Sequence, residues 1–483
     1  MTRPRAAVFF LLFTASIFAC GSNADPPRGV GGASGGGTSQ GGGGSGSGGE
    51  GQGGEGGMMP ACIAAPPPTC DSVEADVYGF AVVDAEPYCL GTVLACSEGP
   101  AASPAVVDLG MPPNITATTG YTSQRLVYRT ERRAGQAGVG SAMMLWPDTV
   151  DPTAPLVVVA HGTAGLADDC APSKLPSGGT TDLVFPYVGN GMPVITIDYA
   201  GLGTEGVQGY GEWYDTAQSV LDGARAGLAM LGADRPIVVI GHSQGGGAVF
   251  ATQALAGSVA PELDLVLAVA HAGGFTTKTT ITPTQAALLP LAPINGANGA
   301  TRAINAVALY ATYANLFGER QAPLVFHPDV RDTVVNAIDN QCVYDIVTAL
   351  ATPGPGYLPP DTYGELVEPG FLDAVIACLQ MDADACTPEG QAYADHLQAA
   401  PPLPDPEGAP LVFLGGENDI LYLPKTYACN LAYLETAMVP HEGCFVAGAT
   451  HGDLVARSAR AVLDRILGEP LVCPPEAPLA ACP

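Results

Sequence analysis

The sequence has 483 residues, 47% of them hydrophobic, which is enough to fill one large core or two ordinary ones. It carries 18 Lys and Arg against 47 Asp and Glu, so its net charge is -29. This excess of negative charge repels phosphate backbones, and we therefore expect a globular protein with no nucleic-acid partner.

Residues 1–20 predict an export signal. Arg3 and Arg5 precede an apolar run, residues 6–18, that is too short to span a bilayer, which is the layout of a secretory signal. Residues 17–20, Ile-Phe-Ala-Cys, resemble a bacterial lipobox, although Ile17 replaces the usual leucine. On this interpretation Cys20 is lipidated and attaches the chain to a membrane; the alternative is an ordinary signal peptide cut elsewhere. We expect an exported protein, either a cell-surface or outer-membrane lipoprotein or a secreted one.

Two segments without long apolar periods follow the signal. Residues 21–57 consist mostly of glycine, a composition that loses too much backbone entropy to fold, so we expect a disordered tether. Residues 58–119 contain cysteines and prolines, and we expect a small disulfide-stapled extension lying on the main domain. A separate binding module is the alternative for this extension.

The cysteines indicate an oxidising compartment. The chain has 13 cysteines, and setting aside Cys20 leaves an even number that can form up to six disulfides. Their spacing matches no zinc pattern, so we expect no metal site and no cofactor. Spacing does not determine the connectivity, and a pairing of near neighbours such as Cys429 with Cys444 is only a guess.

Residues 120–274 have the pattern of an α/β fold. The segments "RLVYRT" and "GSAMMLWP" predict a hairpin, and "PLVVVA" and "MPVITIDYA" are short runs typical of strands buried on both faces. An amphipathic helix over residues 215–231 follows, with Asp215 and Gln218 placed for a capping box. A further strand, Ile237 to Gly241, leads into a helix that opens at Gln244. This alternation predicts a mostly parallel central sheet with crossover helices.

Ser243 lies where that strand meets that helix, within Gly-His-Ser-Gln-Gly. Only a very sharp turn can present a side chain there, and Gly241 and Gly245 are where such a turn has no room for a Cβ atom. The N-terminus of the following helix would favour a developing oxyanion near the serine hydroxyl. We therefore predict that Ser243 is a nucleophile. The same G-x-S-x-G spacing around Ser34 and Ser39 lies in the glycine-rich tether and carries no such context.

A serine nucleophile needs a base and an orienting carboxylate, and residues 410–483 offer both. Asp419 follows the apolar run Leu411 to Leu414, and His451 follows "CFVAGAT" and precedes a C-terminal helix. In the chain, the order is Ser243, Asp419, His451, and the acid and the histidine each come just past a strand. This is the order required of enzymes whose nucleophilic serine lies at such a sharp turn between a strand and a helix.

Several other residues compete for these roles. His242 is expected to point away from the serine and pack nearby, His161 belongs to a different motif, and His271 precedes every candidate acid. Glu417 could replace Asp419, because either carboxylate could reach a histidine on a loop. Asp453 is interpreted as an N-cap of the last helix.

Acyl transfer also needs donors for the oxyanion. His161-Gly162-Thr163 directly follows a buried strand, where one backbone N–H is expected, and the residue after the nucleophile supplies the other. We predict the N–H groups of Thr163 and Gln244 as the oxyanion hole, with Ala164 as the alternative to Thr163.

Together, the motifs "AHGTAG", "ITIDYAGLGTEG", "VLDGARA", "GHSQGG", "GGENDILYLP" and "GATHGD" resemble the secretory lipase branch of the α/β-hydrolase superfamily, from Tyr121 to Leu467. The resemblance implies hydrolysis of carboxylic esters or triacylglycerols, hence a small-molecule or lipid ester as substrate. It also implies a helical lid between the serine and the acid, and residues 275–409 fill that position. Segments such as "INAVALYATYANLF" have the length and apolar content of helices.

Other functions are compatible with the same motifs. The triad could cleave amides, as serine peptidases of this superfamily do, or transfer the acyl group to an alcohol instead of water. The chain could also be a non-catalytic surface-binding lipoprotein on a hydrolase scaffold, since a fold does not fix a function. The complete set Ser243, Asp419 and His451 argues against this last interpretation. The sequence does not determine the oligomeric state.

Overall fold

A nine-stranded sheet forms the centre of the computed structural model, which describes residues 62–175, 181–275, 281–294, 298–399 and 401–482. The predicted signal, Cys20 and the tether lie outside these residues. The strand order is β1-β2-β3-β5-β4-β6-β7-β8-β9. The strands are β1 Val93–Glu98, β2 Tyr121–Arg132, β3 Gln136–Pro147, β4 Leu156–Ala160, β5 Val194–Asp198, β6 Ile237–His242, β7 Leu265–His271, β8 Leu411–Gly416 and β9 His441–Val446.

The sheet is mostly parallel, as predicted. Strands β4 to β9 pair in parallel, whereas β1, β2 and β3 are joined by antiparallel pairing, and β3 also pairs antiparallel with β5. The parallel strands β4 and β5 are buried along their whole length, which explains why they read as uninterrupted apolar runs. The predicted hairpin is β2 and β3, and the two strands pair from end to end.

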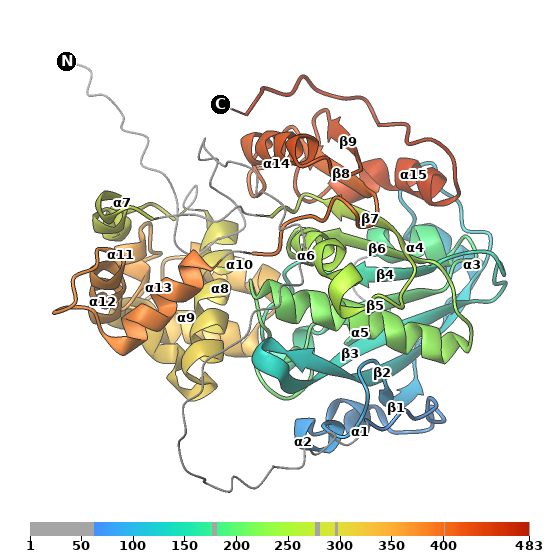
Figure 1. Ribbon diagram of the computed structural model, residues 1–483, viewed down its shortest axis with the longest axis horizontal. Coiled ribbons are helices and arrows are strands. Elements are labelled where there is room, and N and C mark those ends of the chain that lie inside the picture. Colours follow the sequence, from blue (N-terminus) through green and yellow to red (C-terminus); the bar gives the residue numbers. More distant parts are fainter. Residues whose placement is uncertain (1–61, 176–180, 276–280, 295–297, 400, 483) are drawn as a thin grey trace, which may run out of the picture.

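Helices cover both faces of the sheet (Figure 1). Helices α5 and α6 pack against each other, as do α4 and α15, and Phe413 of β8 packs against rings of α6 and α14. The helices of the core are α4 Thr181–Val188, α5 Trp213–Leu231, α6 Gln244–Val259, α14 Pro424–Thr436 and α15 Leu454–Ile466, and its 3₁₀ helices are η1 Arg133–Gly135, η2 Asp168–Cys170 and η3 Pro172–Lys174. The chain therefore has the α/β architecture that the alternation of strands and helices predicts.

The capping box predicted for α5 is wrong. The helix begins at Trp213, two residues before Asp215, and its N-cap is Glu212. The Asp215 carboxylate instead accepts hydrogen bonds from the side chain of Arg132 and the backbone N–H of Arg133. The side chain of Asp215 is therefore bound by residues far from it in the chain, which the local sequence does not reveal.

The residues before Tyr121 contribute a strand to the sheet. Strand β1 pairs antiparallel with β2 and forms one edge of the sheet, so this segment extends the core as well as lying on it. Its helices are α1 Glu74–Tyr78, α2 Val82–Ala85 and α3 Pro104–Leu109. Two disulfides, Cys62–Cys89 and Cys70–Cys96, staple the segment.

Residues 281–294 and 298–399, which we call the cap, are mostly helical and have a hydrophobic core of their own. They lie to one side of the sheet, in yellow and orange in Figure 1. The cap helices are α7 Pro283–Ala287, η4 Leu289–Leu291, α8 Gly299–Phe317, η6 Glu319–Val325, α9 Pro328–Asn340, α10 Val343–Ala351, α11 Tyr363–Leu366, α12 Pro369–Leu379 and α13 Pro388–Gln398. Among the described residues, no helix of the protein is both long and apolar enough to cross a bilayer.

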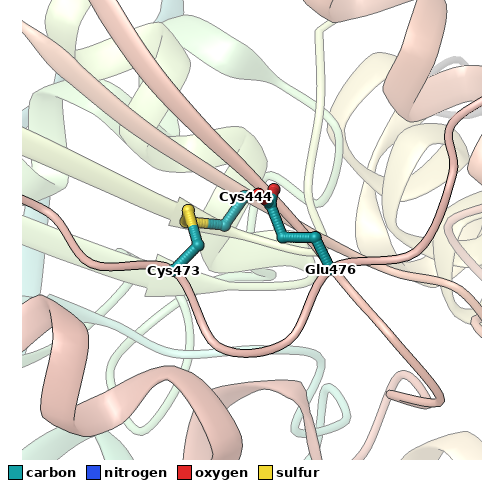
Figure 2. A group of neighbouring side chains, drawn as sticks. All are labelled: Cys444, Cys473 and Glu476. Carbon is teal, nitrogen blue, oxygen red and sulfur yellow. A yellow bond between two sulfur atoms is a disulfide. The ribbon is translucent and has the colours of Figure 1, made fainter.

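All twelve cysteines in the described part of the chain form disulfides. The guessed pairing of Cys429 with Cys444 is wrong, because each pairs with the C-terminal tail, in Cys429–Cys482 and Cys444–Cys473. Glu476 lies beside the second bridge (Figure 2), but the two sulfur atoms are bonded to each other and the carboxylate accepts the N–H of Phe445, so this group is no metal site.

The turn between β6 and α6 depends on glycine. Ser243 has φ 57° and ψ -116°, a strained backbone conformation for a residue with a side chain. A Cβ atom on Gly241 would lie 2.1 Å from the carbonyl oxygen of Gly245, and one on Gly245 would lie 2.0 Å from the carbonyl oxygen of Ala160. Helix α6 therefore approaches strands β6 and β4 more closely than would be possible with a side chain at Gly241 or Gly245.

We predict that Gly245→Ala lowers the free energy of unfolding by about 3 kcal/mol or more, because backbone must move to admit the methyl group. Gly257→Ala in the same helix is the control, since the nearest atom to its Cβ is 4.0 Å away. This change should be neutral or stabilise the protein by up to about 1 kcal/mol. Urea titration measures both, and equal effects of the two changes would contradict the explanation.

Candidate active site

The structure brings Ser243, His451 and Asp419 together in one hydrogen-bonded row. His451 Nε2 lies 2.9 Å from Ser243 Oγ, and His451 Nδ1 lies 2.8 Å from Asp419 Oδ2. Ser243 follows β6, Asp419 follows β8, and His451 lies in the loop between β9 and α15. Because these strands are parallel, their carboxyl ends meet at the same edge of the sheet, and three residues far apart in the chain become neighbours.

The carboxylate beside His451 is held rigidly. Asp419 is buried, and its Oδ1 accepts hydrogen bonds from the backbone N–H groups of Leu421 at 2.8 Å and Tyr422 at 2.7 Å. This leaves Oδ2 to face the imidazole. Glu417, the alternative acid, instead accepts the N–H of Gly448 at 2.8 Å.

Asp453 occupies the N-cap position of α15, as interpreted from the sequence, but its side chain makes no capping hydrogen bond. Its Oδ1 accepts from the backbone N–H of Thr450 at 2.6 Å, and its Oδ2 pairs with Arg457 at 2.8 Å. Asp453 thus braces the loop that carries His451.

Three further histidines surround the site without contacting Ser243 Oγ. Burial lowers the pKa of His161 and of His271 to about 4. Burial, together with the neighbouring His451 and His271, lowers the pKa of His242 to about 3. All three rings are therefore neutral at pH 7. His242 donates from Nε2 to the backbone oxygen of His451 at 2.8 Å, and the two rings lie 4.7 Å apart, so His242 helps to position the loop that carries His451.

The two predicted oxyanion donors belong to segments that adjoin Ser243. Gln244 is the first residue of α6, where a backbone N–H has no partner within the helix. A Cβ atom on Gly162 would lie 3.6 Å from Ser243 Cβ, so the loop that contains Thr163 packs against the serine. Thr163 Oγ1 bonds the hydroxyl of Tyr210 at 2.7 Å, while the carbonyl of Ala164 accepts the N–H of Val343 in the cap at 2.8 Å.

A cavity between the core and the cap opens onto Ser243 and His451. Its volume is about 90 Å³, and its lining is mainly apolar. The core contributes α5, α6 and the loops after β7 and β8, and the cap contributes α8 and α13, through Ile304, Ala308, Thr312, Tyr393, His396 and Leu397. Sequence reasoning missed these cap residues, because nothing in a helical apolar pattern distinguishes a residue that faces the site from one that faces the core.

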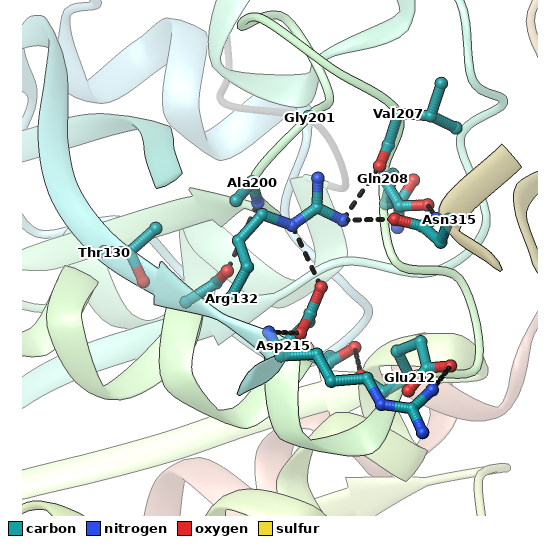
Figure 3. A network of polar contacts seen from close by, with 12 residues as sticks. Thr130, Arg132, Ala200, Gly201, Val207, Gln208, Glu212, Asp215 and Asn315 are labelled. Carbon is teal, nitrogen blue, oxygen red and sulfur yellow. Dashed lines mark hydrogen bonds and ion pairs between the residues drawn. The ribbon is translucent and has the colours of Figure 1, made fainter. Parts of the chain in front are cut away.

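A network of polar contacts joins the cap to the core beside this cavity (Figure 3). Arg132 pairs with Asp215 at 2.9 Å and donates to the carbonyl of Val207 and to Asn315 Oδ1 of α8, each at 2.9 Å. On another side, the disulfide Cys170–Cys342 ties the cap covalently to the loop after β4. The cap is therefore fixed to the core at two separated places.

Comparisons with known proteins bear on the fold of this chain and on its class. A family model described as secretory lipase matches residues 178–349, which include Ser243 and the first part of the cap but end before Asp419. Candida antarctica lipase A in its closed state is similar in structure, at a TM-score of 0.57 and 15% identity over 86% of this chain and 91% of that one.

Two bacterial structures are similar as well. The rice cell wall degrading esterase LipA from Xanthomonas oryzae aligns at a TM-score of 0.54 and 19% identity over 79% of this chain and 97% of that chain. A putative hydrolase from Legionella pneumophila aligns at a TM-score of 0.57 and 17% identity over 77% of this chain and 98% of that chain. No curated protein matches the sequence. The likenesses show the α/β-hydrolase fold, and together with the family match they support a lipase-like ester hydrolase.

The buried histidines predict a dependence of stability on acid. His271 has a folded pKa of about 4, below the value of about 6.5 in an unfolded chain. Between these values the unfolded state binds more protons, so acidification through this range lowers the free energy of unfolding. We predict that His271→Leu reduces the loss of stability between pH 7 and pH 5 by about 2 kcal/mol. Urea titration at both pH values measures the loss of stability. A loss as large in His271→Leu as in the unaltered protein would refute this role of His271.

Proposed function

We propose that this lipase-like α/β-hydrolase cleaves carboxylic esters through an acyl-enzyme formed on Ser243. The observation that carries the proposal is the unbroken row from Ser243 Oγ through His451 to Asp419 Oδ2, with hydrogen-bond distances of 2.9 and 2.8 Å. A serine hydroxyl alone is a weak nucleophile at neutral pH, and this row supplies both a base and a group that orients the base.

In the proposed reaction, Ser243 Oγ attacks the ester carbonyl carbon while its proton passes to His451 Nε2. The backbone N–H groups of Thr163 and Gln244 stabilise the negative oxygen of the tetrahedral intermediate. His451 then returns the proton to the departing alcohol, and an acyl-enzyme remains. Water, deprotonated by the same imidazole, releases the acid and restores the serine. Asp419 orients the imidazole and stabilises the imidazolium in both steps.

The size of the cavity favours short acyl chains in the conformation observed. Sites for drug-sized ligands have volumes of about 300–1,000 Å³, several times the volume of about 90 Å³ found here. A long acyl chain would need movement of the cap, which the Cys170–Cys342 disulfide restrains on one side.

The direct test is hydrolysis of p-nitrophenyl esters from acetate to palmitate, with Ser243→Ala in parallel. We expect activity that is greatest on short chains and falls in the variant by at least about 10³-fold in kcat, with the fold intact. Retained activity in Ser243→Ala would refute the proposal. Aminoacyl p-nitroanilides, assayed alongside, distinguish an esterase from a peptidase.

We also propose that the chain is exported and attached to a membrane through a lipidated Cys20. The support is the lipobox-like sequence, together with the disulfides, which fit an oxidising compartment. Cys20→Ser should move the protein from the membrane fraction to the soluble fraction of the cell envelope, as measured by fractionation and immunoblotting. An unchanged distribution would contradict the lipid anchor.

A further inference from the structure

The cap places three side chains with polar atoms, those of Thr312, Tyr393 and His396, in the otherwise mainly apolar wall of the substrate cavity. His396 of α13 and Thr312 of α8 both line the cavity that opens onto Ser243. Neither residue lies in the hydrogen-bonded row of the proposed mechanism. Their chemistry therefore bears on which ester is bound and not on how the ester bond is broken.

The largely buried carboxylate of Glu212 fixes the ring of His396. Nδ1 lies 2.9 Å from Glu212 Oε1, and the two side chains are only 16% and 13% exposed. Arg133 pairs with the same carboxylate oxygen at 3.2 Å. Burial opposes ionisation of Glu212, but the hydrogen bond and charge of His396 and the two nearby arginines outweigh it and lower the pKa of this carboxyl. With Nδ1 engaged, Nε2 is the ring nitrogen left for a ligand, and it has no hydrogen-bond partner among the described residues.

Thr312 contributes a second polar group without a hydrogen-bond partner among the described residues. Its side chain is largely buried and lines the same cavity, and its Oγ1 has no hydrogen-bond partner in the described part of the chain. Thr216, across the cavity, differs in this respect, because its hydroxyl donates to the backbone oxygen of Glu212 at 2.9 Å. Unsatisfied polar atoms in the cavity wall therefore come from the cap and, in the core, from the side-chain amide of Gln244.

We propose that His396, oriented by Glu212 and assisted by Thr312, selects esters that carry a hydroxyl group away from the scissile bond. This inference rests on the proposed ester hydrolysis at Ser243. A hydroxyl both donates and accepts, so it can bind an imidazole in either protonation state. When the imidazole is neutral, the charge of Glu212 faces that of Arg133, which leaves no unbalanced charge to attract an ionic ligand. A site with polar atoms that await a substrate hydroxyl discriminates against the analogue that lacks it.

The experiment compares pairs of esters that differ in a hydroxyl, using the full chain. 2-Hydroxyethyl butyrate against n-propyl butyrate tests a hydroxyl in the alcohol part, and ethyl 3-hydroxybutyrate against ethyl butyrate tests one in the acyl part. We expect a higher kcat/KM for the hydroxylated ester in at least one pair, and His396→Phe should reduce that ratio by about three- to tenfold, the value of one hydrogen bond. If His396→Phe does not fold, Thr312→Val, which keeps the shape of its side chain, decides the same question.

Leu397→Met is the matched control, because Leu397 lines the cavity next to His396 without a polar atom. It should leave the ratio unchanged. A role of His396 in cap packing alone would lower kcat/KM for both members of a pair equally, and an unchanged ratio in His396→Phe and Thr312→Val would overturn the inference. Loss of all ester hydrolysis in Ser243→Ala together with unchanged ratios would leave the proposed function standing and refute only the specificity.

Discussion

The close approach of α6 to strands β4 and β6 is the constraint on which the site depends. With Gly241 and Gly245 at the contacts, the chain turns sharply enough to hold Ser243 at φ 57° and present its hydroxyl at the carboxyl edge of the sheet. The same turn places the N-terminus of α6 next to Ser243, where negative charge would develop in the proposed acyl transfer. The parallel order of β6, β8 and β9 then brings Asp419 and His451 to that edge. The strain at one residue is thus compensated by packing along a whole helix.

Electrostatics around the serine follow from burial. His161, His242 and His271 are neutral at pH 7, so no second imidazolium competes with the one that forms on His451 in the proposed mechanism. The cap closes the site from the other side, tied by the Cys170–Cys342 disulfide and by the contact of Arg132 with Asn315. Core and cap therefore have separate roles in our account: the core carries the reacting groups, and the cap shapes what reaches them.

The sequence predicts those parts of this structure that local patterns encode. Buried strands, the glycines around Ser243 and the order of serine, acid and histidine all have short-range signatures, and they led to the correct architecture and to residues that lie together. Partners that come from far along the chain could not be predicted. Asp215 is bound by Arg132 instead of capping its helix, Cys429 and Cys444 pair with the C-terminal tail, and the strand β1 adds to the sheet from a segment without clear periodicity. No pattern in the sequence marks His396, because the role that we propose for it depends on its contact with Glu212, the N-cap residue of α5 in the core.

The central claim, that Ser243 is an activated nucleophile, is tested most directly by covalent labelling of the folded protein with a fluorophosphonate, followed by digestion and mass spectrometry of the peptides. Our account predicts a single adduct on the peptide that contains Ser243, which is lost when the protein is unfolded before labelling or when His451 is replaced by alanine. Labelling of a different serine, or no labelling of a protein shown to be folded, would contradict it.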